Sequence, residues 1–287
     1  MISLLFSLLF AQEDFPPKFV VARETSRALQ LAQRIEVISE SLLGIPYKLS
    51  PEGEGNGFDP DPLQNFTHMD CLTYVETVLS FSMSETWNEA MDVRNDLRYL
   101  EDEIHYENRK HFMFSQWIPS NLDLGYIQDI TAQIGPSTHI SRVFDESLWK
   151  NWRGRRKIPL QEDVYPRGDF GIDVLPISEA VKHTGSIPSG SIVVVVLETR
   201  AGYPIMVSHV GFVIDVPTAK GGFVKKMRHA TTIGKIDQVK EHSLSWYFRH
   251  LRDYPHRRKI FGIAVFYPKY PNDEDVVLSE LLYGKMR

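Results

Sequence analysis

The only cysteine of the chain, Cys71, follows an aspartate at the start of a helical pattern. Asp70 is a favourable N-cap residue, and the apolar residues Leu72, Val75 and Val78 recur at helical spacing. At a helix N-terminus the free backbone N–H groups and the helix dipole favour a thiolate, and the same N–H groups can bind an oxyanion beside the sulfur. This arrangement predicts a cysteine nucleophile, although a lone cysteine is more often a small buried hydrophobic residue.

A thiol nucleophile needs a base, and two histidines lie in segments with the composition of β-strands. His209 lies in residues 207–216 and His229 in residues 223–231. If these strands pair across the loop at 217–222, the two imidazoles lie near each other on one face of a sheet. We therefore expect His209 to act as the base and His229 to orient it by accepting or donating a hydrogen bond. The alternative is that each histidine is an ordinary polar residue.

Metal and nucleic-acid binding are two further chemistries to weigh. The chain has no His-Glu-x-x-His motif and no second cysteine, so we expect neither a metal nor another cofactor. Its net charge is −5, and the basic run at residues 153–157 is short and more typical of a solvated loop. We therefore expect no nucleic-acid partner.

The N-terminus and the composition indicate an exported globular protein. The 287 residues are 43% hydrophobic and 24% charged. An apolar run at residues 2–10 is followed by a short polar stretch and resembles an export signal. We expect residues 1–22 to be a leader, residues 23–287 to form one domain, and the protein to be periplasmic or extracellular. No other run is long enough to cross a membrane, so we expect no stable membrane insertion.

The order of predicted elements indicates an α+β fold. Helical periodicity marks residues 24–43, the segment that begins at Cys71, residues 84–104 and residues 123–134. Strand patterns follow at residues 192–197, 207–216, 223–231 and 260–267. A further helix is expected at residues 243–253. Residues 106–121 resemble an ordered loop, and 137–185 have no firm assignment. N-terminal helices should therefore pack on an antiparallel sheet, with a large, mostly helical insertion at about 84–185.

Five short motifs follow one another in the order found in a known enzyme group. They are Gly44-Ile45-Pro46-Tyr47, Asp70-Cys71, Ile187-Pro188-Ser189-Gly190-Ser191-Ile192-Val193, Ser208-His209-Val210-Gly211 and Arg228-His229-Ala230. In this order they resemble the landmarks of the NlpC-type cysteine peptidases of the papain-like clan. Residues 106–121 also resemble the bacterial N-acetylmuramoyl-L-alanine amidase-like family, a former domain of unknown function. The resemblance extends from about residue 28 to residue 267.

The resemblance implies a Cys-His-His triad that hydrolyses an amide bond of bacterial peptidoglycan through a thioester. Cys71 matches the nucleophile, His209 the general base and acid, and His229 the orienting residue. Tyr47 matches a tyrosine that neighbours the nucleophile in the wider group. Leu72, in contrast, stands where the wider group usually has a serine, which suits the narrower amidase-like family.

Substrate contacts are expected at Tyr47 and Asp70 beside the nucleophile, and at Arg109, His111 and Trp117 in the insertion. The stem peptides of peptidoglycan carry carboxylates that cationic side chains would bind. The alternative for the last three residues is that they only hold their loop together. The partner is peptidoglycan or a free muropeptide. The family name points to the muramoyl–L-alanine amide and the wider clan to the γ-D-glutamyl–diaminoacid bond, which the catalytic core slightly favours.

Two other functions compete with this interpretation. A non-catalytic protein that binds peptidoglycan fragments would keep the fold, but it would have no need of a nucleophile with its base. A structural domain with a buried cysteine would react slowly with alkylating agents at neutral pH. The sequence gives no prediction of the oligomeric state.

Overall fold

The computed structural model describes residues 15–101, 103–253 and 258–283. The predicted leader at 1–22 therefore lies mostly outside the described residues. Its last part belongs to helix α1 (Pro17–Ser26), in which Phe19 is fully buried in the core. A leader whose removal leaves this core intact would end before Pro17.

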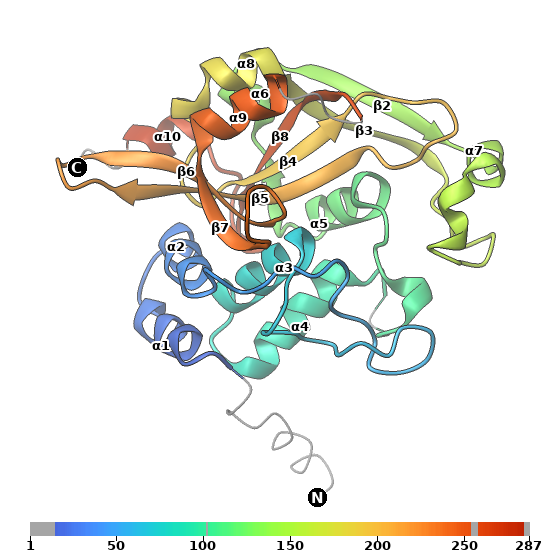
Figure 1. Cartoon of the computed structure of the whole chain (residues 1–287), viewed down its shortest axis with the longest axis horizontal. Helices are drawn as coiled ribbons and strands as arrows, with labels where there is room; N and C mark the ends of the chain where they lie inside the picture. The colour runs from blue at the N-terminus through green and yellow to red at the C-terminus, as the bar shows by residue number, and fades with distance from the viewer. Residues whose placement is uncertain (1–14, 102, 254–257, 284–287) are drawn as a thin grey trace, which may run out of the picture.

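The N-terminal part of the chain forms a layer of helices below the sheet (Figure 1). These helices are α1, α2 (Leu31–Ser41), α3 (Cys71–Ser82) and α4 (Trp87–Arg98). The prediction of one helix at 24–43 was wrong, because the chain breaks after Ser26 and Gln30 starts α2 in a capping box with Gln33. Helix α4 is shorter than the predicted helix at 84–104.

The strands form one antiparallel sheet of eight among the described residues. Their order is β2-β3-β8-β4-β5-β6-β7, and β1 pairs with β8 outside this path. The bounds are β1 (Ile127–Asp129), β2 (Thr138–Phe144), β3 (Gly168–Pro176), β4 (Ile192–Leu197), β5 (Val207–Pro217), β6 (Phe223–Thr231), β7 (Gln238–Ser243) and β8 (Ile260–Pro268). The predicted strands β4, β5, β6 and β8 are confirmed to within one residue, whereas β7 was not predicted.

The predicted insertion at 84–185 is only partly helical, because it also supplies β1, β2 and β3 to the sheet. The helix predicted at 123–134 was wrong. Helix α5 (Ile118–Asp123) ends there, and Gly125, with φ +78°, turns the chain into β1 and the short α6 (Thr131–Ile134). The segment at 106–121, expected to be a loop, contains a 3₁₀ helix (Tyr106–Asn108), a π-helix (Met113–Trp117) and the start of α5.

Helices cover both faces of the sheet (Figure 1). Helix α3 packs on one face, where Tyr74 and Val75 join the core that contains Phe212. Helices α8 (Ile177–Lys182) and α9 (Leu244–Asp253) cover the other face together with α6. The short helices α7 (Glu146–Asn151) and α10 (Leu278–Tyr283) lie towards opposite ends of the view. All six residues of β4 are buried, which confirms it as a central strand. No helix in the described ranges is both long and apolar enough to cross a membrane.

A tight contact between β3 and β8 gives a test of the sheet. A Cβ atom at Gly262 would overlap the carbonyl oxygen of Leu175. We expect Gly262→Ala to lower the free energy of unfolding by about 1–3 kcal/mol, because the paired backbones must move apart. Urea unfolding followed by tryptophan fluorescence measures this change.

The matched control for this test is Gly185→Ala. No heavy atom lies within 4 Å of the Cβ position at Gly185, and its φ is not positive. Its free energy of unfolding should change by about 1 kcal/mol or less. Equal destabilisation by the two substitutions would contradict the packing argument.

Candidate active site

Cys71 is the first residue of helix α3, as its sequence context predicts. The carboxylate of Asp70 accepts hydrogen bonds from the backbone N–H groups of Leu72 at 3.0 Å and Thr73 at 2.9 Å. The hydroxyl of Thr73 accepts in turn from the backbone N–H of Asp70 at 3.0 Å. This capping box fixes the first turn of the helix and leaves the N–H of Cys71 itself beside the sulfur.

The Cys71 side chain is partly exposed and lies against strand β5. The backbone N–H groups of Val210, the residue after His209, and of Cys71 and Leu72 lie close enough to its sulfur to favour the thiolate and so lower the pKa of the thiol. Burial, together with the charge of Asp70, outweighs them and raises this pKa to about 12. The resting group is therefore a neutral thiol, in contrast to the thiolate that its position at a helix N-terminus favours.

A row of three histidines crosses strands β5, β6 and β7. Nε2 of His209 lies 2.6 Å from Nδ1 of His229, and Nε2 of His229 lies 2.9 Å from Nδ1 of His242. His229 is fully buried, and each of its ring nitrogens bonds to a neighbouring imidazole. The two histidines that alternation predicted to be neighbours do lie together, and a third, His242, joins them.

The sheet register explains this row. Strand β5 pairs with β6 so that Phe212 opposes Arg228, which sets Gly211 opposite His229. A Cβ atom at Gly211 would lie 2.7 Å from the Cβ of His229, so this position has room only for glycine. Strand β7 pairs with β6 so that His242 opposes Met227. The three histidines are therefore diagonal neighbours on one face of the sheet.

The surroundings keep these imidazoles neutral. Burial lowers the pKa of His209 to about 4, with a smaller contribution from His242. Burial also lowers the pKa of His229 well below its ordinary value, and that of His242 falls through burial and the nearby Lys240. A neutral imidazole is the form that accepts a proton. Among the described residues, no group of three or more His, Cys, Asp or Glu side chains is arranged to hold a metal ion.

Two tyrosines lie close to this group. Tyr247 of α9 is almost fully buried, and its ring centroid lies 5.0 Å from that of His229 and 6.3 Å from that of His209. Burial and the charge of Cys71 raise the pKa of Tyr247. Tyr47, which the family resemblance places beside the nucleophile, is half-buried and forms a backbone bridge with Met69. Burial, followed by the charge of Cys71, raises the pKa of Tyr47. Tyr247 was not among the residues predicted from the sequence.

A pocket of about 310 Å³ adjoins the start of helix α3. Asp70 lines it, as do the predicted substrate contacts Arg109 and His111. Arg109 already bonds both carboxylate oxygens of Glu54, at 2.7 and 2.6 Å. Nε2 of His111 lies 2.7 Å from the carbonyl oxygen of Tyr106, and burial lowers the pKa of His111 to about 4. Arg109 also donates to the carboxylate of Asp59 at 2.9 Å. The pocket wall therefore mixes acidic and basic side chains, and Asp70 and Leu72, the neighbours of Cys71, line it.

Trp117 differs from the other two residues predicted in the insertion. Its side chain is fully buried, and its indole N–H donates to Glu76 at 3.0 Å. Arg98 pairs with the same Glu76 at 2.7 Å and lies 3.6 Å from Glu52, which also pairs with Arg94. The geometry thus favours the alternative given above for Trp117, that it holds its loop in place.

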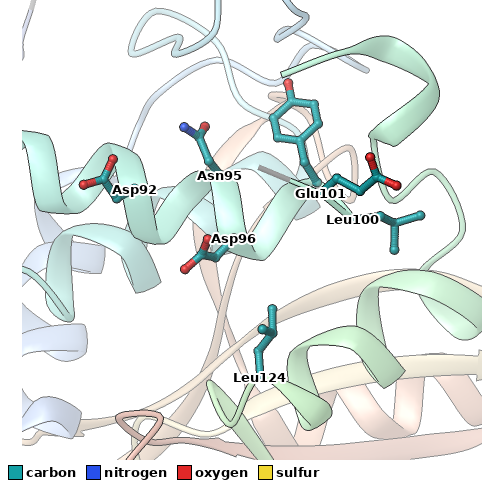
Figure 2. Close-up of a pocket in the computed structure, with 7 residues that line it drawn as sticks. Asp92, Asn95, Asp96, Leu100, Glu101 and Leu124 are labelled. Carbon is teal, nitrogen blue, oxygen red and sulfur yellow. The ribbon is translucent and has the colours of Figure 1, made fainter. Parts of the chain in front are cut away.

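Figure 2 shows a second pocket, also of about 310 Å³, whose wall includes Asp92 and Asp96 of α4 and Leu124 across from them. Neither Cys71 nor any of the three histidines lines it. Tyr126 donates to the Asp96 carboxylate at 2.6 Å. Its acidic wall would repel the carboxylates of a stem peptide, so the chemistry described above lies elsewhere.

Comparison with known proteins identifies the family model that fits this chain. The model described as N-acetylmuramoyl-L-alanine amidase-like matches residues 37–253, more than half of the chain. This range contains Cys71, His209, His229 and His242.

Solved structures share the fold. A crystal structure of a Legionella pneumophila protein, LPG0564, of family DUF1460, superimposes with a TM-score of 0.74 at 22% identity, covering 87% of this chain and 93% of that one. An N-acetylmuramoyl-L-alanine amidase from Bacteroides uniformis superimposes with a TM-score of 0.63 at 20% identity, covering 84% and 99%. Both match the arrangement of N-terminal helices on an antiparallel sheet. At these identities the likeness concerns the fold alone.

One curated human protein also matches part of the sequence. Pleckstrin homology domain-containing family A member 7 is 26% identical over 162 residues, which are 52% of this chain. The chain spans 14% of the length of that protein.

The low pKa of His209 predicts an unusual pH profile for the reactivity of Cys71. If His209 takes the thiol proton, it can do so above about pH 4, where it is neutral, and not below that pH, where it is protonated. We expect the rate constant for alkylation by iodoacetamide to stay nearly constant from pH 5 to 8 and to fall as the pH drops through about 4. Mass spectrometry of the modified protein measures this rate.

His209→Phe is the control for the pH profile. If His209 is the base, the alkylation rate of this variant should rise about tenfold per pH unit over the same range, since only the free thiolate then reacts. A wild-type rate that already falls by half near pH 6.5 would contradict the lowered pKa of His209.

Proposed function

The chain belongs to the N-acetylmuramoyl-L-alanine amidase-like family, and we propose that it hydrolyses an amide bond of peptidoglycan peptides with Cys71 as the nucleophile. One observation carries this proposal. The sulfur of Cys71, at the start of α3, lies near the backbone N–H of Val210, in the strand segment that also holds His209. A thiol and a neutral imidazole backed by a second imidazole are the parts that a cysteine hydrolase needs.

The first half of the reaction forms a thioester. As the Cys71 sulfur attacks the amide carbonyl carbon, the thiol proton passes to Nδ1 of His209, the ring nitrogen that does not face His229. The N–H of Cys71 stabilises the oxyanion, because Asp70 occupies the N–H groups of Leu72 and Thr73. The C–N bond then breaks, and His209 returns the proton to the leaving amine.

The second half restores the enzyme. His209 takes a proton from a water molecule, whose oxygen attacks the thioester carbon. The C–S bond breaks, and the proton returns to the sulfur of Cys71. The net change is hydrolysis of one amide to a carboxylic acid and an amine, so no cofactor takes part.

The pocket at the start of helix α3 is the cavity in which we place part of the peptide. Stem peptides carry carboxylates, and the exposed Lys157 in the pocket wall supplies a positive charge, whereas Arg109 is already paired with Glu54 and Asp59. Two amide bonds are candidates, the muramoyl–L-alanine bond that the family name denotes and the γ-D-glutamyl–diaminoacid bond that the wider clan suggests. Because peptidoglycan lies outside the cytoplasm, this substrate also accords with the predicted export of the protein to the periplasm or the extracellular space.

Digestion of muropeptides tests the proposed function. We expect the wild type to cleave disaccharide-linked or free muropeptides, and Cys71→Ala to lose at least about 10³-fold in rate, because no other group can form the thioester. Mass spectrometry of the products measures cleavage and separates the two bonds by the masses of the fragments.

Cys71→Ser is the matched control, since it keeps the size of the side chain but is a far weaker nucleophile at neutral pH. It should bind muropeptides like the wild type and cleave them as poorly as Cys71→Ala. Binding of muropeptides by all three proteins with no product from the wild type would replace the hydrolase with a peptidoglycan-binding protein.

A further inference from the structure

His242 lies outside the proposed triad but completes a row of hydrogen-bonded rings. It follows His209 and His229 in the row, with its Nδ1 2.9 Å from Nε2 of His229. Its ring stacks on Trp246 of α9, with centroids 4.9 Å apart and an angle of 26°, and Trp246 stacks in the same way on His250. The His242 ring is therefore held by stacking on Trp246 and by the hydrogen bond with His229.

Counting the protons on the ring nitrogens leaves two possible proton orders, in which the hydrogen bonds of the row run either from His209 towards His242 or from His242 towards His209. A neutral imidazole has one N–H donor and one bare nitrogen acceptor. If His209 keeps Nδ1 bare to receive the thiol proton, its Nε2–H donates to Nδ1 of His229. Nε2–H of His229 must then donate to a bare Nδ1 of His242. In the reverse order His242 donates, and His209 ends with its proton on Nδ1, where it cannot accept one.

We propose that His242 is a positioning residue that sets the proton order of the row and so keeps His209 able to act as a base. This inference rests on the proposed roles of Cys71 and His209. His229 cannot set the order alone, because it is fully buried and each of its ring nitrogens bonds to an imidazole that can donate or accept. His242, the last ring of the row, is half-exposed, and the nitrogen on which it carries its proton determines the proton order of the row.

The charges around His242 disfavour the unproductive order. A protonated His242 would donate from Nδ1 and impose the reverse order on the whole row. Burial, followed by the positive charges of Lys240 of β7, His250 of α9 and Lys226 of β6, lowers the pKa of His242. These causes disfavour the protonated form of His242, the form that would impose the reverse order.

A matched pair of variants tests the proposal. His242→Phe keeps an aromatic ring on Trp246 but has no acceptor, whereas His242→Asn loses the ring but can place its side-chain oxygen near the position of Nδ1. In serine proteases the wrong tautomer of the base costs about 10⁴-fold in kcat. We expect His242→Phe to lower the rate of Cys71 alkylation by iodoacetamide at pH 7 at least tenfold, and His242→Asn to stay within about threefold of the wild type.

The alkylation assay needs no peptidoglycan, so it separates the two hypotheses, with His209→Phe as reference. Slow alkylation of His209→Phe beside a wild-type rate for His242→Phe would overturn the role of His242 and leave the proposed base intact. Wild-type rates for both variants would overturn the base, and the role of His242 with it. Circular dichroism confirms that each variant is folded.

A measurement on the wild type keeps the proposal testable if His242→Phe does not fold. Long-range ¹H–¹⁵N NMR spectra of protein with ¹⁵N-labelled histidine report which ring nitrogen carries the proton. We expect His229 to be protonated at Nε2 and bare at Nδ1 at pH 7. Protonation of His229 at Nδ1 would overturn the proposal.

Discussion

The register of β5, β6 and β7 is the constraint on which the candidate site depends. A shift of one residue would turn His209 or His229 to the opposite face and separate the imidazoles. Gly211 makes this register possible, because its missing side chain leaves space for His229, whose Cβ would otherwise be 2.7 Å away. Strand β5 also supplies the N–H of Val210 to the Cys71 sulfur. The same strand therefore positions the nucleophile and the proposed base.

Helix α3 is held in place by buried ion pairs. Glu76 in its middle bonds Arg98 of α4 and the indole of Trp117, while Glu52 from the preceding loop pairs with Arg94 and Arg98. Removing one member of such a network leaves an uncompensated buried charge, which is strongly destabilising. The insertion therefore holds the nucleophile helix α3 in place through Arg98 and Trp117, which bond Glu76. Another aromatic residue of the insertion, Tyr106, lines the pocket.

The sequence predicted the parts of the fold whose local pattern agrees with their final environment. The cap at Asp70 and the buried run of β4 are such cases, as is the alternation around His209. The break between α1 and α2 was missed because residues 24–43 keep one helical period across it. Arg23 donates to the backbone carbonyl of Glu85 and Arg34 to its carboxylate, and these tertiary contacts have no signature in the local sequence. Strand β7 has only one buried residue, Val239, so its hydrophobic signal was too weak to reveal His242.

Burial changes what the helix N-terminus contributes to Cys71. Three backbone N–H groups favour the thiolate, yet the surroundings keep both the thiol and His209 neutral at rest. In a site of this kind the charged pair forms only when the proton moves, and the N–H groups are then best used on the charge that develops in the transition state. Reactivity depends on the readiness of His209 to accept a proton at the nitrogen that faces away from His229. The direction of the hydrogen bonds along the histidine row is therefore as important to the site as the positions of its atoms.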